Sequence, residues 1–300
     1  QIRRMACGLQ AMGVQKGDRV GLYLPNTPHY VAAYYGALMA GAIVVNFSPL
    51  YTAAELEHQV EDSGTKILFT LSAKALLPTA MEVLEHSTLE TLIVGSVAEM
   101  LPPVKSLLFR WFKASESVAI PDDPRIIRYD RFMTNKGDCA VAQIDPVNDV
   151  ALLQYTGGTT GFPKGVMQSH SAIWASGMGS LPMFGMTRDS RYLHVAPMFH
   201  MADFAGGMGA TLSAAQNVVL QGFDPVAVMT TVAEKKITHG LLVPAMIKML
   251  LDHPDIAAAD FSSMEKIIYG ASPMPAATLQ RCMELWPHIG MVQAYGQTEL

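Results

Sequence analysis

The sequence predicts an α/β fold in which mostly parallel sheets are flanked by helices. Short apolar, strand-like runs alternate with helix-like segments along most of the 300 residues. Half of the residues are hydrophobic and only 16% are charged, which suits a well-packed core. No uncharged apolar run reaches the roughly 18 residues of a membrane-spanning helix. Alternation of strands and helices is typical of parallel sheets covered on both faces.

The first elements follow this alternation closely. Strands are expected at residues 19–24, 43–45, 66–71 and 92–94, and helices at 27–40 and 52–62. Two residues mark the start of the first helix: threonine, here Thr27, is a common N-cap, and proline, here Pro28, suits the first helical position. Thr52 and Glu55 form a capping-box pattern for the second helix, and Gly64 marks its end.

Residues 96–148 break the alternation, because they contain five prolines and few strand signals. We interpret them as a surface insertion that leads into a linker. Within them, residues 104–113 are basic and amphipathic, a pattern that suits contact with a membrane surface or a short helix packed on its own domain. The second alternative is favoured, because ten residues are few for an independent membrane anchor.

After residue 148 the alternation returns. Strands are expected at residues 150–153, 166–168, 192–195, 218–220, 238–243, 266–269 and 291–294, with helices at 171–184 and from about Asp224, Pro244 and Pro275. The approximate subregions are therefore a first α/β part at 1–95, the insertion and linker at 96–148, and a second α/β part at 149–300. Glycines between 206 and 209 either leave room for a long ligand or allow close helix packing.

Charge and cysteine content exclude several classes of protein. The net charge of -5 and the lack of a basic face with interleaved aromatic residues argue against a nucleic-acid binder. Cys7, Cys139 and Cys282 are odd in number and far apart, which suggests a reducing compartment without a disulfide framework or a Cys-x-x-Cys metal site. The histidines form no metal-binding spacing and no obvious pair.

The most informative segment is the glycine-rich stretch 155–165, Tyr-Thr-Gly-Gly-Thr-Thr-Gly-Phe-Pro-Lys-Gly. Glycines let backbone N–H groups approach a ligand and form anion-binding concavities. Threonine hydroxyls add donors, and Lys164 adds a compact positive charge that suits phosphate. The stretch therefore predicts a polyphosphate cradle, although it is neither a Walker loop nor a Gly-x-Gly-x-x-Gly motif. The alternative is a mobile surface hairpin.

This stretch resembles the phosphate-binding signature of the AMP-forming adenylating enzymes, a superfamily that includes acyl-CoA synthetases, peptide-synthetase adenylation domains and luciferases. Residues 196–201, Ala-Pro-Met-Phe-His-Met, and 295–299, Tyr-Gly-Gln-Thr-Glu, resemble two further family segments in the same order. The resemblance implies that residues 1–300 are an incomplete adenylating-enzyme large domain, truncated at both ends. It places the ribose-binding aspartate, the hinge and a small C-terminal domain with its lysine outside this sequence.

The resemblance also assigns roles to individual residues. It places the β- and γ-phosphates of ATP on Thr156, Gly157, Gly158, Thr159, Thr160, Gly161 and Lys164, and the α-phosphate on Thr298. It assigns the adenine to Gly270, Ala271, Ser272 and Tyr295, with Gly296 among the nucleotide-binding residues. It places Mg²⁺ on Glu299 and the acyl carboxylate beside Phe199 and His200. Of these, Thr156, Lys164, Thr298 and Glu299 are the expected catalytic residues. The alternatives without a ligand-binding role are that residues 270–272 form an ordinary strand-to-helix turn and that Glu299 is a solvated surface residue. His200 is expected to position the substrate without transferring a proton.

The sequence resembles bacterial long-chain-fatty-acid–CoA ligases in three segments, residues 46–52, 55–58 and 153–158. The expected reaction is ATP-dependent activation of a fatty acid to an acyl-adenylate and then, with coenzyme A, to acyl-CoA, releasing AMP and pyrophosphate. The expected location is cytoplasmic, with peripheral membrane contact left open. The alternatives are a ligase for a short, branched or aromatic acid and a nucleotide-binding fragment without turnover. Residues 1–300 alone are expected to be nearly inactive.

Overall fold

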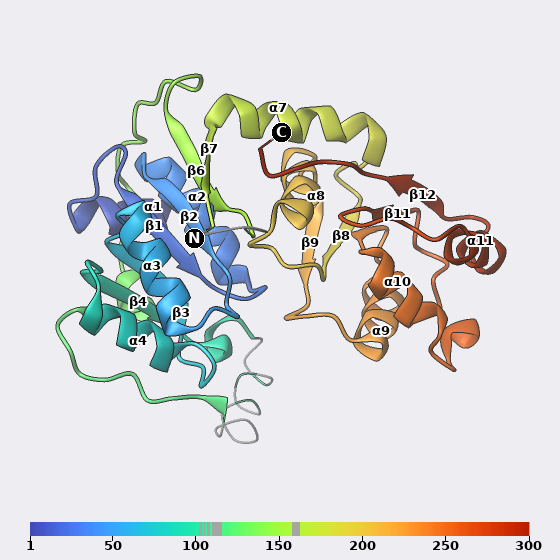
Figure 1. The fold of residues 1–300 in the computed structure, drawn as a ribbon, viewed down its shortest axis with the longest axis horizontal. Coiled ribbons are helices and arrows are strands. Elements are labelled where there is room, and N and C mark those ends of the chain that lie inside the picture. Colours follow the sequence, from blue (N-terminus) through green and yellow to red (C-terminus); the bar gives the residue numbers. More distant parts are fainter. Residues whose placement is uncertain (102–103, 105, 107–108, 110–115, 158–162, 300) are drawn as a thin grey trace. The chain divides into compact units, whose positions relative to one another are not determined.

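The structure is a computed structural model that describes residues 1–300 except 102–103, 105, 107–108, 110–115, 158–162 and 300. The chain divides into two compact units, Gln1–Ser171 and Ala172–Leu300. Each unit holds a largely parallel sheet flanked by helices, which confirms the predicted fold class (Figure 1). The division differs from the expected subregions, because the strands on both sides of the glycine-rich stretch belong to the first sheet.

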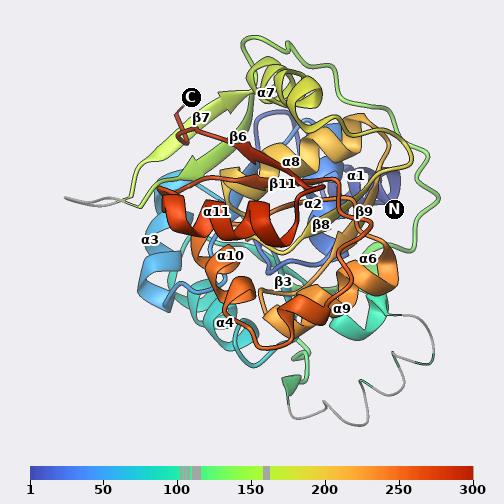
Figure 2. The same cartoon turned by 90° about the vertical axis from the view of Figure 1, so that its right-hand side faces the viewer.

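The first unit is built on a seven-stranded sheet with the order β5-β4-β3-β1-β2-β6-β7. Its strands are β1 (Arg19–Tyr23), β2 (Ile43–Phe47), β3 (Ile67–Leu71), β4 (Thr91–Gly95), β5 (Ile126–Arg128), β6 (Val150–Tyr155) and β7 (Gly165–Ser169). Neighbouring strands run parallel except β6 and β7, which form an antiparallel pair. Figure 2 shows β6 and β7 side by side as the arms of one hairpin.

Helices cover both faces of this sheet. The helix α1 (Ile2–Ala11) packs on α2 (Pro28–Ala40), and α3 (Ala53–Ser63) packs on α4 (Leu77–His86). The helices α2 and α3 make crossovers in opposite directions along the sheet, so the right-handed rule places them on opposite faces.

The predicted N-caps of α2 and α3 differ in outcome. The capping box at α3 is confirmed, because the Thr52 N–H donates to Glu55 Oε2 at 2.9 Å and Thr52 Oγ1 accepts the Glu55 N–H at 3.4 Å. Gly64 ends this helix in the left-handed conformation with φ 65°. Thr27 stands at the N-cap position of α2, but its hydroxyl lies 2.9 Å from His29 Nδ1 and caps no backbone N–H.

The stretch 96–148 is more structured than expected. After a short 3₁₀ turn (Val97–Met100), the strand β5 pairs with β4 and continues into the one-turn helix α6 (Tyr129–Phe132). Phe132 is buried against Phe69, with ring centroids 5.8 Å apart. The interpretation of this part as a surface insertion is therefore wrong for residues 126–132, which complete the sheet and its core. The amphipathic segment 104–113 lies largely outside the described residues.

The cysteine prediction is also wrong. Cys7 on α1 and Cys139 form a disulfide with Cα atoms 5.4 Å apart, whereas Cys282 is buried and free. The chain after α6 runs back along α1, where Asn135 Nδ2 donates to the Arg4 carbonyl at 2.8 Å and Gln10 Nε2 donates to the Ala140 carbonyl at 2.9 Å. The two cysteines are far apart in the sequence but adjacent in the fold. The expectation of a reducing compartment, which was based on their separation, therefore has no support.

Reduction of this disulfide is expected to lower the free energy of unfolding of the first unit by about 2–4 kcal/mol. The bond closes a loop between residues 132 positions apart, and loops of that size restrict the unfolded chain strongly. The measurement is urea unfolding with and without dithiothreitol. A variant with both Cys7→Ser and Cys139→Ser is the control, because reductant should leave it unchanged. Equal stability of the wild type in both conditions would contradict the prediction.

The second unit holds a five-stranded sheet with the order β12-β11-β10-β8-β9, and all its neighbouring strands are parallel. The strands are β8 (Arg191–His194), β9 (Gln216–Val219), β10 (His239–Leu241), β11 (Lys266–Tyr269) and β12 (Gly290–Gln293). The helices are α7 (His170–Phe184), which starts in the first unit, α8 (Met201–Leu212), α9 (Pro225–Lys235), α10 (Pro244–Leu251) and α11 (Ala276–Leu285), with a 3₁₀ turn at Ile256–Ala258.

Two apolar clusters pack against this second sheet. The larger one joins side chains of α9, α10 and α11 to Leu193 and Ile267 of the sheet. The smaller one joins Ala210 of α8 to Tyr192 and Ile268, the neighbours of those two residues along their strands. Because successive strand residues point to opposite faces, α8 covers one face and α9, α10 and α11 cover the other.

Candidate functional site

The predicted adenine, α-phosphate and acyl residues all follow strands of the second sheet. Because β8, β11 and β12 run parallel, their carboxyl ends meet at one edge, where open α/β sheets bind ligands. Phe199 and His200 follow β8, the turn at 270–272 follows β11, and Tyr295 follows β12. The fold therefore brings three segments that are distant in sequence to the same edge of one sheet.

The turn after β11 and the chain after β12 lie in direct contact. A Cβ on Gly270 would lie 2.3 Å from the carbonyl oxygen of Ala294, so only glycine fits there. Ala271 has φ 64°, a left-handed conformation that is strained for a residue other than glycine. The Tyr295 side chain is 83% exposed beside this turn, so its ring is accessible to a ligand.

The remaining residues of this segment are also at the surface. Ser272, Gly296 and Glu299 are exposed, and Thr298 is half-buried. The described residues contain no cluster of three or more metal-ligating side chains. A single carboxylate at Glu299 fits Mg²⁺ only where phosphate oxygens and water complete its coordination.

His200 is the N-cap of α8. Its Nδ1 accepts the backbone N–H of Ala202 at 3.3 Å, which leaves the ring proton on Nε2. Desolvation lowers the pKa of His200 below its ordinary value, so the neutral ring predominates at pH 7. The neutral ring has one N–H donor at Nε2, a group that can orient a carboxylate. The positioning role expected for this residue stays a prediction.

A buried polar cluster that was not predicted from the sequence joins β8, α8 and β9. His194 Nδ1 lies 2.7 Å from Asp203 Oδ2, and the Tyr192 hydroxyl donates to Asp203 Oδ1 at 3.2 Å. His194 Nε2 lies 2.7 Å from Asn217 Oδ1. The expectation that no histidine forms a pair is therefore wrong for His194. The available signal was Asp203 itself, a carboxylate in an otherwise apolar helix.

The glycines of α8 explain why this pair can form. A Cβ on Gly206 would lie 2.0 Å from the Tyr192 hydroxyl, and one on Gly207 would lie 2.8 Å from the His194 ring. Both glycines therefore face β8, where they let the helix approach the buried polar side chains. Of the two alternatives for residues 206–209, these contacts favour close packing.

The glycine-rich stretch joins β6 to β7 in the first unit. Tyr155 and Gly165 are register partners, and the Thr156 N–H donates to the Lys164 carbonyl at 3.1 Å. Gly157 and Lys164 are exposed, whereas Thr156 is half-buried. The predicted phosphate-binding residues Gly158, Thr159, Thr160 and Gly161 lie outside the described residues.

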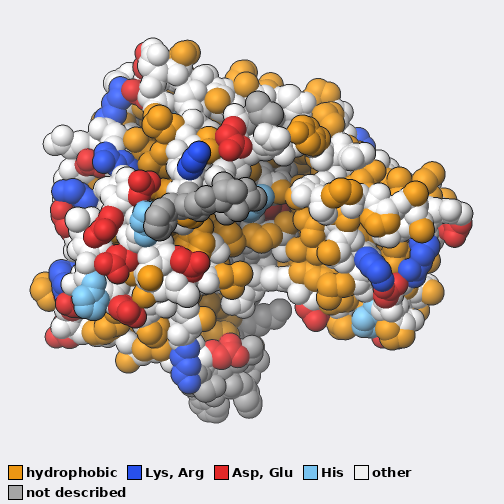
Figure 3. All heavy atoms as spheres, viewed as in Figure 1, with side chains coloured by type: hydrophobic (Ala, Val, Ile, Leu, Met, Phe, Trp, Pro, Cys, Tyr) orange, Lys and Arg blue, Asp and Glu red, His pale blue; other side chains and the backbone are white. Residues whose placement is uncertain are grey.

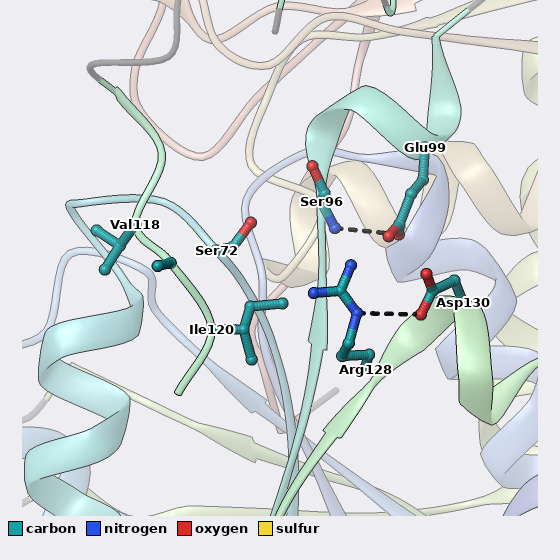
Figure 4. A pocket seen from close by; sticks show the side chains of 8 residues that line it. Ser72, Ser96, Glu99, Val118, Ile120, Arg128 and Asp130 are labelled. Atoms are coloured by element: carbon teal, nitrogen blue, oxygen red, sulfur yellow. Dashed lines mark hydrogen bonds and ion pairs between the residues drawn. The ribbon is translucent and has the colours of Figure 1, made fainter. Parts of the chain in front are cut away.

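A separate cavity of about 440 Å³ lies in the first unit, at the carboxyl ends of β3, β4 and β5 (Figure 4). The backbone N–H of Ser96 donates to Glu99 Oε2 at 3.1 Å, and Arg128 Nε lies 3.5 Å from Asp130 Oδ1. None of the predicted site residues lines this cavity. Glu99 is paired with the backbone and Arg128 with Asp130, so the charged groups of this cavity do not indicate which ligand it would bind.

The surface gives less specific information. On the face shown in Figure 3, Lys and Arg side chains of the described part lie singly or in small groups among Asp and Glu. Of the helices in the described part of the chain, none has both the length and the apolar character needed to cross a membrane.

Comparisons with known proteins agree on one family. The model of the family described as AMP-binding enzyme matches residues 1–300. A long-chain-fatty-acid–CoA ligase of Bacillus subtilis (strain 168) is 33% identical over 303 residues, covering 99% of this chain and 53% of the relative. A feruloyl-CoA synthase of an Amycolatopsis species is 31% identical over 301 residues, covering 100% and 53%. This chain thus spans about half the length of these curated relatives.

Solved structures show the same fold. The crystal structure of a long-chain-fatty-acid-CoA ligase from Archaeoglobus fulgidus superposes with a TM-score of 0.83 at 25% identity, covering 99% of this chain and 56% of that one. The anthranilate CoA ligase AuaEII in complex with anthranoyl-AMP gives a TM-score of 0.85 at 21% identity, covering 99% and 54%. The second likeness concerns the fold alone.

Proposed function

Because the chain belongs to the AMP-binding enzyme family, we propose that the full-length protein activates a carboxylic acid with ATP and transfers the acyl group to coenzyme A. The observation that carries this proposal is the family match over the whole chain. The gathering of Phe199, Gly270 and Tyr295 at one sheet edge supports it, because the acid and the nucleotide must meet for the reaction.

In the proposed reaction, a carboxylate oxygen attacks the α-phosphorus of ATP and pyrophosphate leaves. The thiol of coenzyme A then loses its proton to solvent and attacks the acyl carbon, and AMP leaves. Both partners of the first step are anions, so the site must neutralise charge and hold them in line. We assign the outer phosphates to Thr156 and Lys164 and the α-phosphate to Thr298. Glu299 would hold Mg²⁺, which would supply neutralising positive charge when bound.

We further propose that the acid is a long-chain fatty acid. The 33% identity to the Bacillus ligase supports this substrate, as do residues 46–52 with their resemblance to that class. An aromatic acid is the second candidate, because the feruloyl-CoA synthase is 31% identical and a probable 4-coumarate–CoA ligase of Dictyostelium discoideum is 26% identical. A cytoplasmic reaction, with or without peripheral membrane contact, belongs to the same proposal.

The test is a panel of acids from acetate to oleate, with ferulate and anthranilate included. Pyrophosphate release and acyl-CoA formation are measured on the full-length protein, because this chain spans about half of its relatives. Lys164→Ala is expected to raise the KM for ATP about tenfold, the usual effect of losing one charge-assisted phosphate contact. Release with oleate alone supports the fatty-acid ligase. Release with ferulate would change the substrate, and ATP binding without release would favour a nucleotide-binding protein.

A further inference from the structure

The position of the glycine-rich stretch depends on the last residues of β6. The strand β7 is the edge strand of its sheet and pairs only with β6 among the described strands. Its side chains are exposed or half-buried, so the core does not fix it. The stretch 156–164 joins these two strands, so whatever holds the end of β6 also sets where the stretch begins.

One side of this strand end is held by a chain of buried amide and hydroxyl groups. Gln154 and Asn46 are register partners on β6 and β2, and Asn46 Nδ2 donates to Gln154 Oε1 at 2.9 Å. The Tyr30 hydroxyl of α2 donates to Asn46 Oδ1 at 2.9 Å. Asn46 and Gln154 are at most 5% exposed. Buried polar groups that are fully paired fix one arrangement, because any shift leaves a donor unsatisfied.

The other side is held by Tyr155, the next residue, whose side chain points to the opposite face. Its hydroxyl donates to Asp62 Oδ2 of α3 at 2.5 Å. Its ring lies against Gly165, where a Cβ would be 3.3 Å from the ring. Burial, followed by the hydrogen bond to Asp62 and its charge, raises the pKa of Tyr155, so the phenol stays protonated and donates. Tyr155 is 7% exposed, whereas Asp62 reaches the surface.

We propose that Tyr155 and Asp62, opposed across the sheet by Asn46 and Gln154, are positioning residues that fix where the glycine-rich stretch leaves β6 and so support nucleotide binding by that stretch. This inference rests on the proposed function of that stretch. Neither Tyr155 nor Asp62 contacts the nucleotide in this proposal. They act through the backbone of Thr156, whose N–H donates to the Lys164 carbonyl at 3.1 Å and so ties the two ends of the stretch together. Groups that bind phosphate are effective only when they are held within a fraction of an ångström of the right place.

The test uses the full-length protein and two readouts, the Kd for ATP by calorimetry and the KM values for ATP and for the acid. Tyr155→Phe and Asp62→Ala are each expected to raise the Kd and the KM for ATP about tenfold, the effect of losing one hydrogen bond to a charged group. The KM for the acid should stay within about twofold. Both variants should fold, because Tyr155→Phe keeps the ring and Asp62 lies at the surface.

Rescue by a conservative variant separates positioning from a general structural effect. Asp62→Asn keeps an oxygen that accepts the Tyr155 proton, so its Kd for ATP should lie within about threefold of the wild type. The double variant Tyr155→Phe/Asp62→Ala should be no weaker than Tyr155→Phe, since that variant already removes the hydroxyl and with it the contact to Asp62.

Tyr23→Phe is the matched control, because it removes a fully buried tyrosine hydroxyl from β1 of the same sheet. It should leave the affinity for ATP unchanged. Equal affinities for ATP in Tyr155→Phe, Asp62→Ala and Tyr23→Phe would overturn the positioning role. If the wild type binds ATP but activates no acid, the proposed function fails and the Kd series still decides the positioning role. If the wild type binds no ATP, both proposals fail.

Discussion

Replacing Asp203 by Ala is expected to lower the free energy of unfolding of the second unit by about 3–5 kcal/mol. Removal of one partner of a buried ion pair leaves the other without its partner, and this is among the most costly changes in a core. His194 and Asp203 are 2% and 1% exposed. The Tyr192 hydroxyl would lose its acceptor in the same variant. Urea unfolding of the wild type and the variant measures the difference.

A matched control for this variant exists in the same unit. Asp260 is also paired with a cation, Lys236 Nζ at 2.8 Å, but both side chains are about half exposed. Because exposed ion pairs contribute little, Asp260→Ala should lower the free energy of unfolding by less than about 1 kcal/mol. If Asp203→Ala were as mild as Asp260→Ala, the buried pair would not hold α8 to β8.

The same pair predicts a pH dependence with a definite sign. Burial by itself lowers the pKa of His194, but the Asp203 carboxylate and the hydrogen bonds to Asp203 and Asn217 outweigh it, so the pKa is raised. A group with a raised folded pKa stabilises the fold below its unfolded pKa of about 6.5, and this contribution is lost as the pH rises through the folded value. The stability advantage of the wild type over Asp203→Asn should therefore be larger at pH 6 than at pH 9.

The comparison with Asp203→Asn is needed because another histidine of this unit acts in the opposite direction. Burial lowers the pKa of His239, so its contribution to stability is lost as the pH falls. The two effects overlap in the wild type, but the contribution of His239 cancels in the difference between two proteins that share this residue, so the contribution of His194 remains. A difference that stays constant between pH 6 and pH 9 would exclude a charged His194.

The sequence predicted those features whose cause is local. The helix α3 begins at the predicted capping box and ends at Gly64, because these signals act within a few residues of the helix ends. The strand β11 spans the predicted residues 266–269, a short β-branched run between turn residues. The strand pattern also predicted that the segments after β8, β11 and β12 lie at one edge of the sheet, since parallel strands end at the same edge.

Features that depend on distant partners were missed. The strand β5 has three residues and is defined by its pairing with β4. The disulfide joins cysteines 132 positions apart, which only the return of the chain along α1 brings together. The contacts of Asp203 with Tyr192 and His194 need a helix without a Cβ at residues 206 and 207. In each case the feature depends on a contact between two elements, and the residue pattern of either element alone does not predict that contact.

Replacing Glu299 by Ala is expected to lower kcat/KM for ATP by about 10²–10³-fold in the full-length protein. Under the proposed function, its carboxylate holds Mg²⁺ beside the phosphates, and loss of one group that stabilises developing charge typically has this effect. Glu299 is exposed and follows β12 at the proposed edge. Because its role is electrostatic and its side chain packs little, the thermal midpoint should stay unchanged.

Two further measurements distinguish this role from that of an ordinary surface carboxylate. The Mg²⁺ concentration that gives half-maximal rate should rise in Glu299→Ala, because a hard cation loses its protein oxygen ligand. Glu265→Ala is the matched control, since Glu265 is also exposed but precedes β11 and so lies at the opposite end of the same sheet. This control should keep the wild-type rate and Mg²⁺ requirement. If the two variants behaved alike, Glu299 would be a solvated residue, and the metal site would have to be sought among other carboxylates of the full-length protein.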